Sequence, residues 1–167
     1  MNIRKLIAVA LLAAAPVSYG IAAEPIIAGT VEPSKSELDR GRHLVRVAGC
    51  HECHTPGYVE NWGQVSEDAL LTGDATAYEG RWGAAFPTNL RLNLLRFDDD
   101  GWLRYARNVE TRPPMPWIDL NRMSDEDLLA ILRYVQWLGP KGEPAPQALP
   151  PGESWIGPVV RYTASSP

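Results

Sequence analysis

The sequence predicts an all-α domain of three to five helices joined by long ordered loops. Apolar residues recur at helical spacing in two segments that follow capping patterns, and the alternating pattern of a strand is weak throughout. The chain has 167 residues, of which 45% are hydrophobic, which suits one folded domain and argues against extensive disorder. A net charge of −4 argues against a nucleic-acid-binding protein, because such proteins carry a basic excess or patch.

Residues 1–23 have the features of a secretory signal peptide. Arg4 and Lys5 precede an apolar run over residues 6–17, and small residues follow up to Ala23. This run is shorter than the ~20 residues that span a bilayer, so we expect export and cleavage. An uncleaved membrane anchor is the alternative. Cleavage removes two basic residues and no acidic one, which lowers the net charge from −4 to −6.

A lead-in over residues 24–35 precedes the first predicted helix, over residues 36–49. Ser36 is suited to be its N-cap, with Asp39 as the acidic residue three positions later. Gly41 inside this helix costs roughly 1 kcal/mol relative to Ala. A close approach of another element would explain why the sequence tolerates it.

The middle of the chain, residues 55–100, is rich in glycine and weakly periodic. One short helix is expected near residues 66–71. Three consecutive acids at residues 98–100 precede a predicted helix over residues 101–107, where they suit the helix dipole.

The last predicted helix, residues 124–138, has the strongest signal. Ser124 is a suitable N-cap with Asp127 as its N3 acid, and Met123 and Leu128 are spaced as a hydrophobic staple. A Gly-Pro pair ends the helix. The helical domain is therefore expected over residues 36–139.

Residues 140–167 contain seven prolines and are expected to form an extended tail. Apolar residues near its end would let this tail pack on or beside the domain.

Both cysteines of the chain lie in the pentapeptide C-H-E-C-H at residues 50–54. C-x-x-C-H is the attachment signature of a c-type haem. Two thiols on one helical turn can add to the two vinyl groups of a porphyrin, and the next imidazole can reach the iron. The pattern predicts one haem c attached through Cys50 and Cys53, with His54 as the proximal iron ligand.

Three other interpretations of this pentapeptide remain open: a redox dithiol, a structural disulfide and half of a zinc site. A thioredoxin-like dithiol would need a βαβ context, and the sequence shows none. A zinc site would need His43 or His51 beside the other ligands. Both histidines are expected on the surface, with the His51 side chain directed away from the haem.

Met115 is the candidate for the sixth iron ligand. It lies in the segment Arg-Pro-Pro-Met-Pro-Trp at residues 112–117, where flanking prolines stiffen the backbone. A thioether is a soft ligand suited to haem iron. The alternative is a loop methionine packed on Trp117, which would leave the sixth position open, as in a haem enzyme or a small-ligand sensor.

With these motifs, the chain resembles the class I cytochromes c over roughly residues 36–139. It is similar to small bacterial periplasmic cytochromes and to cytochrome subunits of membrane dehydrogenases, whose ligand loops also read P-P-M-P-W. The resemblance implies a cytochrome c-like fold around one haem. It also implies that the first and last helices cross closely, with Gly41 and Tyr134 at the matching positions.

The resemblance implies an electron carrier in the bacterial periplasm rather than an enzyme, membrane-anchored if the N-terminus stays uncleaved. Its partners would be a redox donor and acceptor, such as a dehydrogenase or oxidase, with no nucleic acid and no small-molecule substrate. A non-catalytic subunit of a membrane oxidoreductase is the alternative. Arg81, Trp82 and Asn89 are candidate donors to the haem propionates, or else ordinary loop residues. A carbonyl should accept the second N–H of His54, and that of Pro56 is near in sequence.

Overall fold

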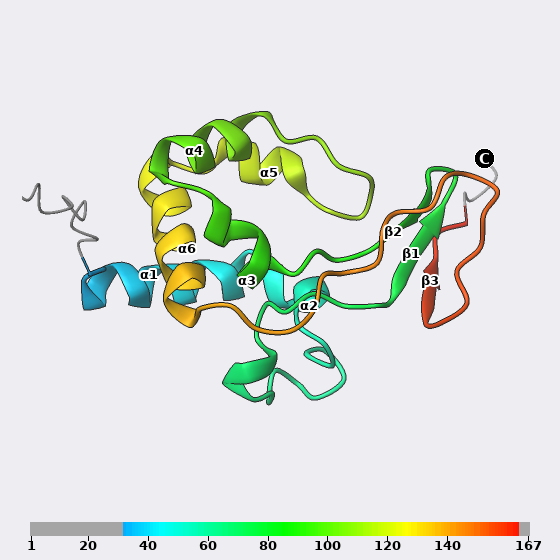
Figure 1. Ribbon diagram of the computed structural model, residues 1–167, viewed down its shortest axis with the longest axis horizontal. Helices are drawn as coiled ribbons and strands as arrows, with labels where there is room; N and C mark the ends of the chain where they lie inside the picture. The colour runs from blue at the N-terminus through cyan, green and yellow to red at the C-terminus, as the bar shows by residue number, and fades with distance from the viewer. Residues whose placement is uncertain (1–31, 164–167) are drawn as a thin grey trace, which may run out of the picture. The chain divides into compact units, whose positions relative to one another are not determined.

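The structure is a computed structural model and describes residues 32–163. The expected signal peptide lies outside these residues. Figure 1 shows a group of helices and a small sheet. The helices are α1 (Lys35–Val47), α2 (Cys50–His54), α3 (Leu90–Asn93), α4 (Asp99–Asn108), α5 (Trp117–Arg122) and α6 (Asp125–Leu138), with 3-10 turns at Glu67–Ala69 and Leu94–Arg96. The strands are β1 (Ala77–Gly80), β2 (Gly83–Ala85) and β3 (Val159–Arg161).

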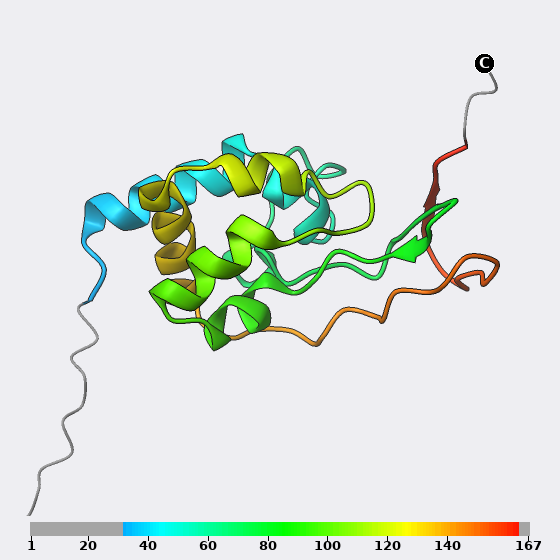
Figure 2. The same cartoon turned by 90° about the horizontal axis from the view of Figure 1, so that it is seen from above.

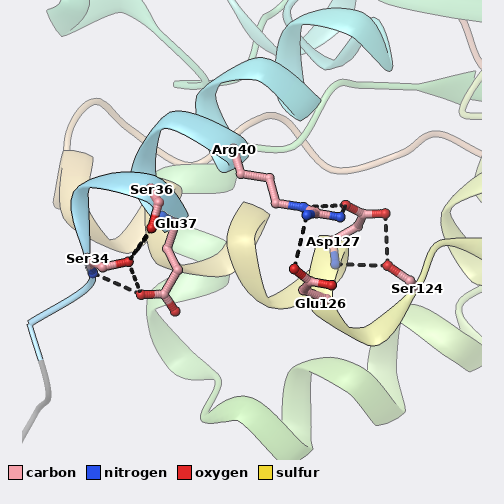
Figure 3. A network of polar contacts seen from close by, with 7 residues as sticks. All are labelled: Ser34, Ser36, Glu37, Arg40, Ser124, Glu126 and Asp127. Carbon is pink, nitrogen blue, oxygen red and sulfur yellow. Dashed lines mark hydrogen bonds and ion pairs between the residues drawn. The ribbon is translucent and has the colours of Figure 1, made fainter.

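The N-cap of α1 lies two residues earlier than predicted, at Ser34 rather than Ser36. The Ser34 hydroxyl accepts a hydrogen bond from the Glu37 backbone N–H (3.2 Å), and the Glu37 carboxylate accepts one from the Ser34 N–H (2.8 Å; Figure 3). Both serines have an acid three residues later. Asp39 pairs instead with Lys35, which lies one turn away on the same helix.

Helices α1 and α6 cross closely at Gly41, as predicted. A Cβ atom on Gly41 would lie 2.1 Å from the Ala130 carbonyl oxygen and 2.6 Å from the Tyr134 Cβ. Arg40, one residue earlier, donates hydrogen bonds to Asp127 (2.8 Å) and Glu126 (3.0 Å) at the start of α6 (Figure 3). The absence of a side chain at Gly41 therefore permits α1 and α6 to pack closely against each other.

The predicted N-cap of α6 is confirmed. Ser124 caps α6, and its hydroxyl accepts a hydrogen bond from the Asp127 N–H (3.1 Å). Asp98 caps α4 in the same way through the Gly101 N–H (2.7 Å). The core lies between these helices and α1, and the indole N–H of Trp102 donates to the Leu128 carbonyl (2.7 Å).

The prediction of a helix-rich chain is confirmed, but the prediction of an all-α chain is wrong. Strands β1 and β2 form an antiparallel hairpin, and β3 joins β1 in parallel to give the order β2-β1-β3. Strand β3 belongs to the C-terminal tail, which is extended over residues 140–163 and runs beside the segment from β2 to α3 (Figures 1 and 2). Such short strands leave little periodic signal, and the partner of β3 lies 82 residues earlier in the chain.

Between residues 32 and 163, no helix is both long and apolar enough to cross a bilayer.

Candidate functional site

A cavity of about 600 Å³ is lined by all four residues that the sequence singled out. Cys50, Cys53 and His54 reach its wall from α2, and Met115 reaches it from the loop before α5. Most of the remaining wall comes from the segment over residues 85–94 and from the loop over residues 109–116, and Trp102, Tyr105 and Ile131 add side chains from α4 and α6. The size and the mostly apolar wall with few polar groups are typical of a site for an organic cofactor.

Helix α2 is a single turn, and this places three of its five side chains on the cavity. Gly49 precedes it in the left-handed backbone region (φ 70°), which allows the chain to turn sharply out of α1. Residues at positions i, i+3 and i+4 of a helix share one face. Cys50, Cys53 and His54 have this spacing, whereas His51 and Glu52 are absent from the cavity wall.

The His54 imidazole is buried and held by a single carbonyl. Its Nδ1 lies 2.7 Å from the backbone oxygen of Thr88, where it donates a hydrogen bond. A carbonyl partner was expected, but it comes from a segment distant in the sequence rather than from Pro56. Burial lowers the pKa of His54, and the bond to Thr88 opposes this shift only in part. The imidazole is therefore neutral with Nε2 unprotonated, which is the form that binds a metal.

The position of Thr88 is itself determined by tight backbone packing. The Gly73 N–H donates to the His54 carbonyl (2.8 Å), and the Asp74 N–H donates to the Pro87 carbonyl (3.2 Å). A Cβ on Gly73 would lie 2.7 Å from the Asn89 nitrogen. These contacts join the end of α2 to the segment that orients its histidine.

The two thiols of the site are free and differ in their surroundings. Burial raises the pKa of Cys50 to about 11, so this thiol is protonated at neutral pH. Tyr78 of β1 lies next to Cys53, and burial together with that thiol raises the pKa of Tyr78. Both thiols face a dry, apolar cavity.

His51 is buried, and the prediction of a surface position for it is wrong; His43 is exposed as predicted. The His51 Nδ1 lies 2.8 Å from the Thr55 hydroxyl, and its ring stacks on Tyr58 at 4.8 Å between centroids. Burial and the nearby charge of Arg46 lower its pKa to about 4. Because the imidazole is neutral, it can be buried without an opposite charge.

The described residues do not favour a zinc site at this motif. Across residues 32–163, no group of three or more His, Cys, Asp or Glu side chains is arranged to hold a metal ion. A thioredoxin-like βαβ unit also does not surround α2, since the helix α1 precedes it and the strands follow it.

Two methionines line the cavity, and the sequence pointed to only one of them. Met115 lies on the proline-rich loop, as expected. Met123, predicted to staple α6, packs against the hydrophobic core and also reaches the cavity wall. Local sequence could not reveal this second position, because it depends on how α5 and α6 pack.

The polar groups on the cavity wall are not the predicted propionate donors. Arg81, Trp82 and Asn89 are absent from the wall. Asn89 instead caps α3, where its side-chain oxygen accepts a hydrogen bond from the Leu92 N–H at 3.1 Å. Asn93 and Arg112 line the cavity in their place. The Asn93 Oδ1 is buried without a hydrogen-bond partner among the described residues, and as an acceptor it needs a donor.

The residues present therefore fit a covalently attached haem. Two thiols, a neutral imidazole with one free nitrogen and a thioether share one cavity, and this donor set suits haem attachment and axial ligation.

Comparison with known proteins supports a relationship to cytochromes c. The chain is 33% identical to the gluconate 2-dehydrogenase cytochrome c subunit of Pantoea cypripedii over 121 residues. The matched region covers 62% of this chain and only 26% of that subunit, so the chain spans about a quarter of its relative. No family model matches the chain, and no solved structure matches it.

Proposed function

We propose that this chain is a monohaem c-type cytochrome that passes single electrons between redox partners in the bacterial periplasm. The observation that carries the proposal is the convergence of Cys50, Cys53, His54 and Met115 on one cavity. The similarity to a cytochrome c subunit supports it. We also propose that residues 1–23 direct export, which would bring the chain to a compartment where c-type haem is attached.

Each site residue would have a separate task. Cys50 and Cys53 would hold the haem through thioether bonds, and His54 and Met115 would be the axial ligands. The bound haem supplies a one-electron iron couple. The Thr88 carbonyl keeps the His54 ring oriented with Nε2 toward the cavity. With both axial positions occupied by side chains, no substrate would bind at the iron.

The walls of the cavity would exclude water from the cofactor. Trp102, Tyr105, Leu94 and Ile131 contribute side chains from α4, α6 and the turn between α3 and α4. A low-dielectric surrounding disfavours the form of the cofactor with the higher charge and thus favours reduction. The protein would thereby influence the potential, in addition to the contribution of a thioether ligand.

A pair of methionine variants tests the ligand assignment. In the exported, haem-loaded protein, Met115→Ala should abolish the long-wavelength absorption band of thioether-ligated ferric haem and lower the reduction potential. Met123→Ala, which alters the same cavity, should retain the band. Loss of the band in Met123→Ala alone would transfer the assignment to Met123. A wild-type protein that lacks the band and binds cyanide rapidly would instead support a haem enzyme or sensor.

A second candidate function is a non-catalytic electron-transfer subunit of a membrane oxidoreductase. The relative in Pantoea cypripedii is described as the cytochrome subunit of a dehydrogenase, which favours this candidate. The chemistry at the site is the same and only the partner differs. Co-purification with a dehydrogenase from solubilised membranes would support a subunit, whereas recovery in the soluble periplasmic fraction would support a free carrier.

A further inference from the structure

The loop that carries Met115 has few polar contacts with the rest of the chain. Three of its residues, Pro113, Pro114 and Pro116, have no N–H to donate. The Met115 carbonyl accepts only from Trp117 (2.9 Å), within the same stretch of chain. Within residues 32–163, the hydrogen bonds from loop residues 110–116 to a distant segment come from the Arg112 side chain.

The Arg112 side chain donates to a site where strand β2 and the C-terminal tail already pair. Ala84 of β2 and Leu149 of the tail form an antiparallel bridge and exchange both backbone hydrogen bonds (3.1 and 3.0 Å). The Arg112 Nη1 donates to the Leu149 carbonyl at 2.7 Å and lies 3.4 Å from the Ala84 carbonyl. The loop, β2 and the tail are therefore joined at one place.

The tail segment over residues 143–163, which we call the strap, is anchored on both sides of this point. Toward its start, the Asn89 amide donates to the Glu143 carbonyl (3.1 Å). Toward its end, the Glu79 carboxylate accepts from the Trp155 N–H and from Arg161, both at 3.1 Å. The strap is thus attached by hydrogen bonds both before and after the Ala84–Leu149 bridge.

The strap also forms part of the cavity itself. Pro146 and Ala148 line the wall, and both come shortly before the bridge residue Leu149 in the sequence. Gly83 of β2 permits this close approach, since a Cβ there would lie 2.1 Å from the Leu149 oxygen. Gly83 also has a φ of +90°, a conformation that side chains strain.

We propose that the strap holds the Met115 loop across the cavity, and that Arg112 is the positioning residue that transmits this constraint. The inference rests on the proposed function, in which Met115 is an axial ligand. Without the strap the loop would keep its prolines but lose its polar attachment to the rest of the chain. An external ligand would then displace Met115 from the iron more readily.

The test uses the haem-loaded full chain and imidazole as the external ligand. Arg112→Met removes the donor, and imidazole affinity should rise about tenfold, which corresponds to the lower end of the range for a hydrogen bond from a charged group because Arg112 is exposed. Arg112→Lys should restore wild-type affinity, because a single nitrogen makes both contacts. Arg122→Met on α5 is the matched control, since Arg122 is exposed and has no polar side-chain partner within residues 32–163. It should leave the affinity unchanged.

Hydrogen–deuterium exchange of residues 109–117 gives a second readout that does not depend on ligation. Exchange should be faster in Arg112→Met and in Gly83→Ala, which displaces the strap without altering the loop. Unchanged exchange in both variants, or an equal change in Arg122→Met, would overturn the proposal. If Met115→Ala leaves the absorption band intact, the ligand assignment fails, while the exchange result still decides whether the strap holds the loop.

Discussion

Replacing Gly41 with Ala should destabilise the protein by about 2 kcal/mol. The added Cβ would lie 2.1 Å from the Ala130 carbonyl oxygen and 2.9 Å from its carbon, and both belong to the backbone of α6. Neither atom can rotate away, so α1 and α6 must separate. Overpacking of this kind costs about 1–3 kcal/mol, and we take the upper end because backbone atoms are involved. Ala is better than Gly in a helix by about 1 kcal/mol, which offsets part of the cost.

Urea unfolding of the haem-loaded protein, followed by circular dichroism, measures this effect. A loss of about 2 kcal/mol should lower the midpoint by roughly 1 M, since such transitions have slopes of about 1–3 kcal/mol per M. Gly101→Ala in α4 is the matched control. Its Cβ would meet mainly the Asp98 carboxylate oxygen (2.7 Å), which can rotate away at the cost of weakening the N-cap of α4, so a smaller loss of stability is expected. If Gly41→Ala were as stable as wild type, or less damaging than Gly101→Ala, the close crossing would not limit stability.

Three further outcomes are expected. Thr55→Val should cost about 1–3 kcal/mol in thermal or urea unfolding, because the buried Leu71 N–H and His51 ring both lose their partner at the Thr55 hydroxyl. Arg40→Met should lower the free energy of unfolding slightly, and by less in acid. The Arg40 hydrogen bond lowers the pKa of Asp127 below 3.8. The stability that this pair contributes is therefore present above pH 3.8 and is lost as pH falls through the lowered pKa. Removal of residues 1–23, as proposed, would leave a net charge of −6. Electron transfer to the cation hexaammineruthenium(III) should then slow as salt rises, whereas transfer to ferricyanide should accelerate.

Each of these outcomes has a result that contradicts it. Wild-type stability in Thr55→Val would mean that water replaces the hydroxyl. A stability difference for Arg40→Met that grows as pH falls from 5 to 3 would show that Asp127 is not the relevant partner (its ordinary pKa being 3.8). Equal salt dependence with the cationic and the anionic reagent would show that net charge does not control the approach to the cofactor.

Features that depend on neighbouring residues could be predicted from the sequence. Ser124 and Asp127 have the spacing of an N-cap and its N3 acid, and this cap is present. The acids at residues 98–100 were placed at the start of a helix, and they lie at the start of α4. The N-cap of α1 was misplaced because two serines satisfied the same pattern. Ser34 was selected by the longer side chain of Glu37, which reaches back to the Ser34 N–H.

Features that depend on distant residues could not be predicted. The partner of His54 lies 34 residues away at Thr88. The Thr55 hydroxyl that contacts the buried His51 ring also accepts a hydrogen bond from the Leu71 N–H, which lies 16 residues further along the chain. The strands are too short for a periodic signal.

The residue order alone was enough to identify the candidate cofactor residues, because their chemistry follows from spacing within one helical turn and from the stiffness of a proline-rich loop. The resemblance to a known family also implied the close helix crossing at Gly41. Only the tertiary structure decided what holds these residues in place. The Thr88 carbonyl, the second methionine on the cavity wall and the junction of Arg112, Ala84 and Leu149 all join segments far apart in the chain. Such contacts form when the chain buries its apolar surface and pairs its remaining polar groups, which is a property of the whole fold.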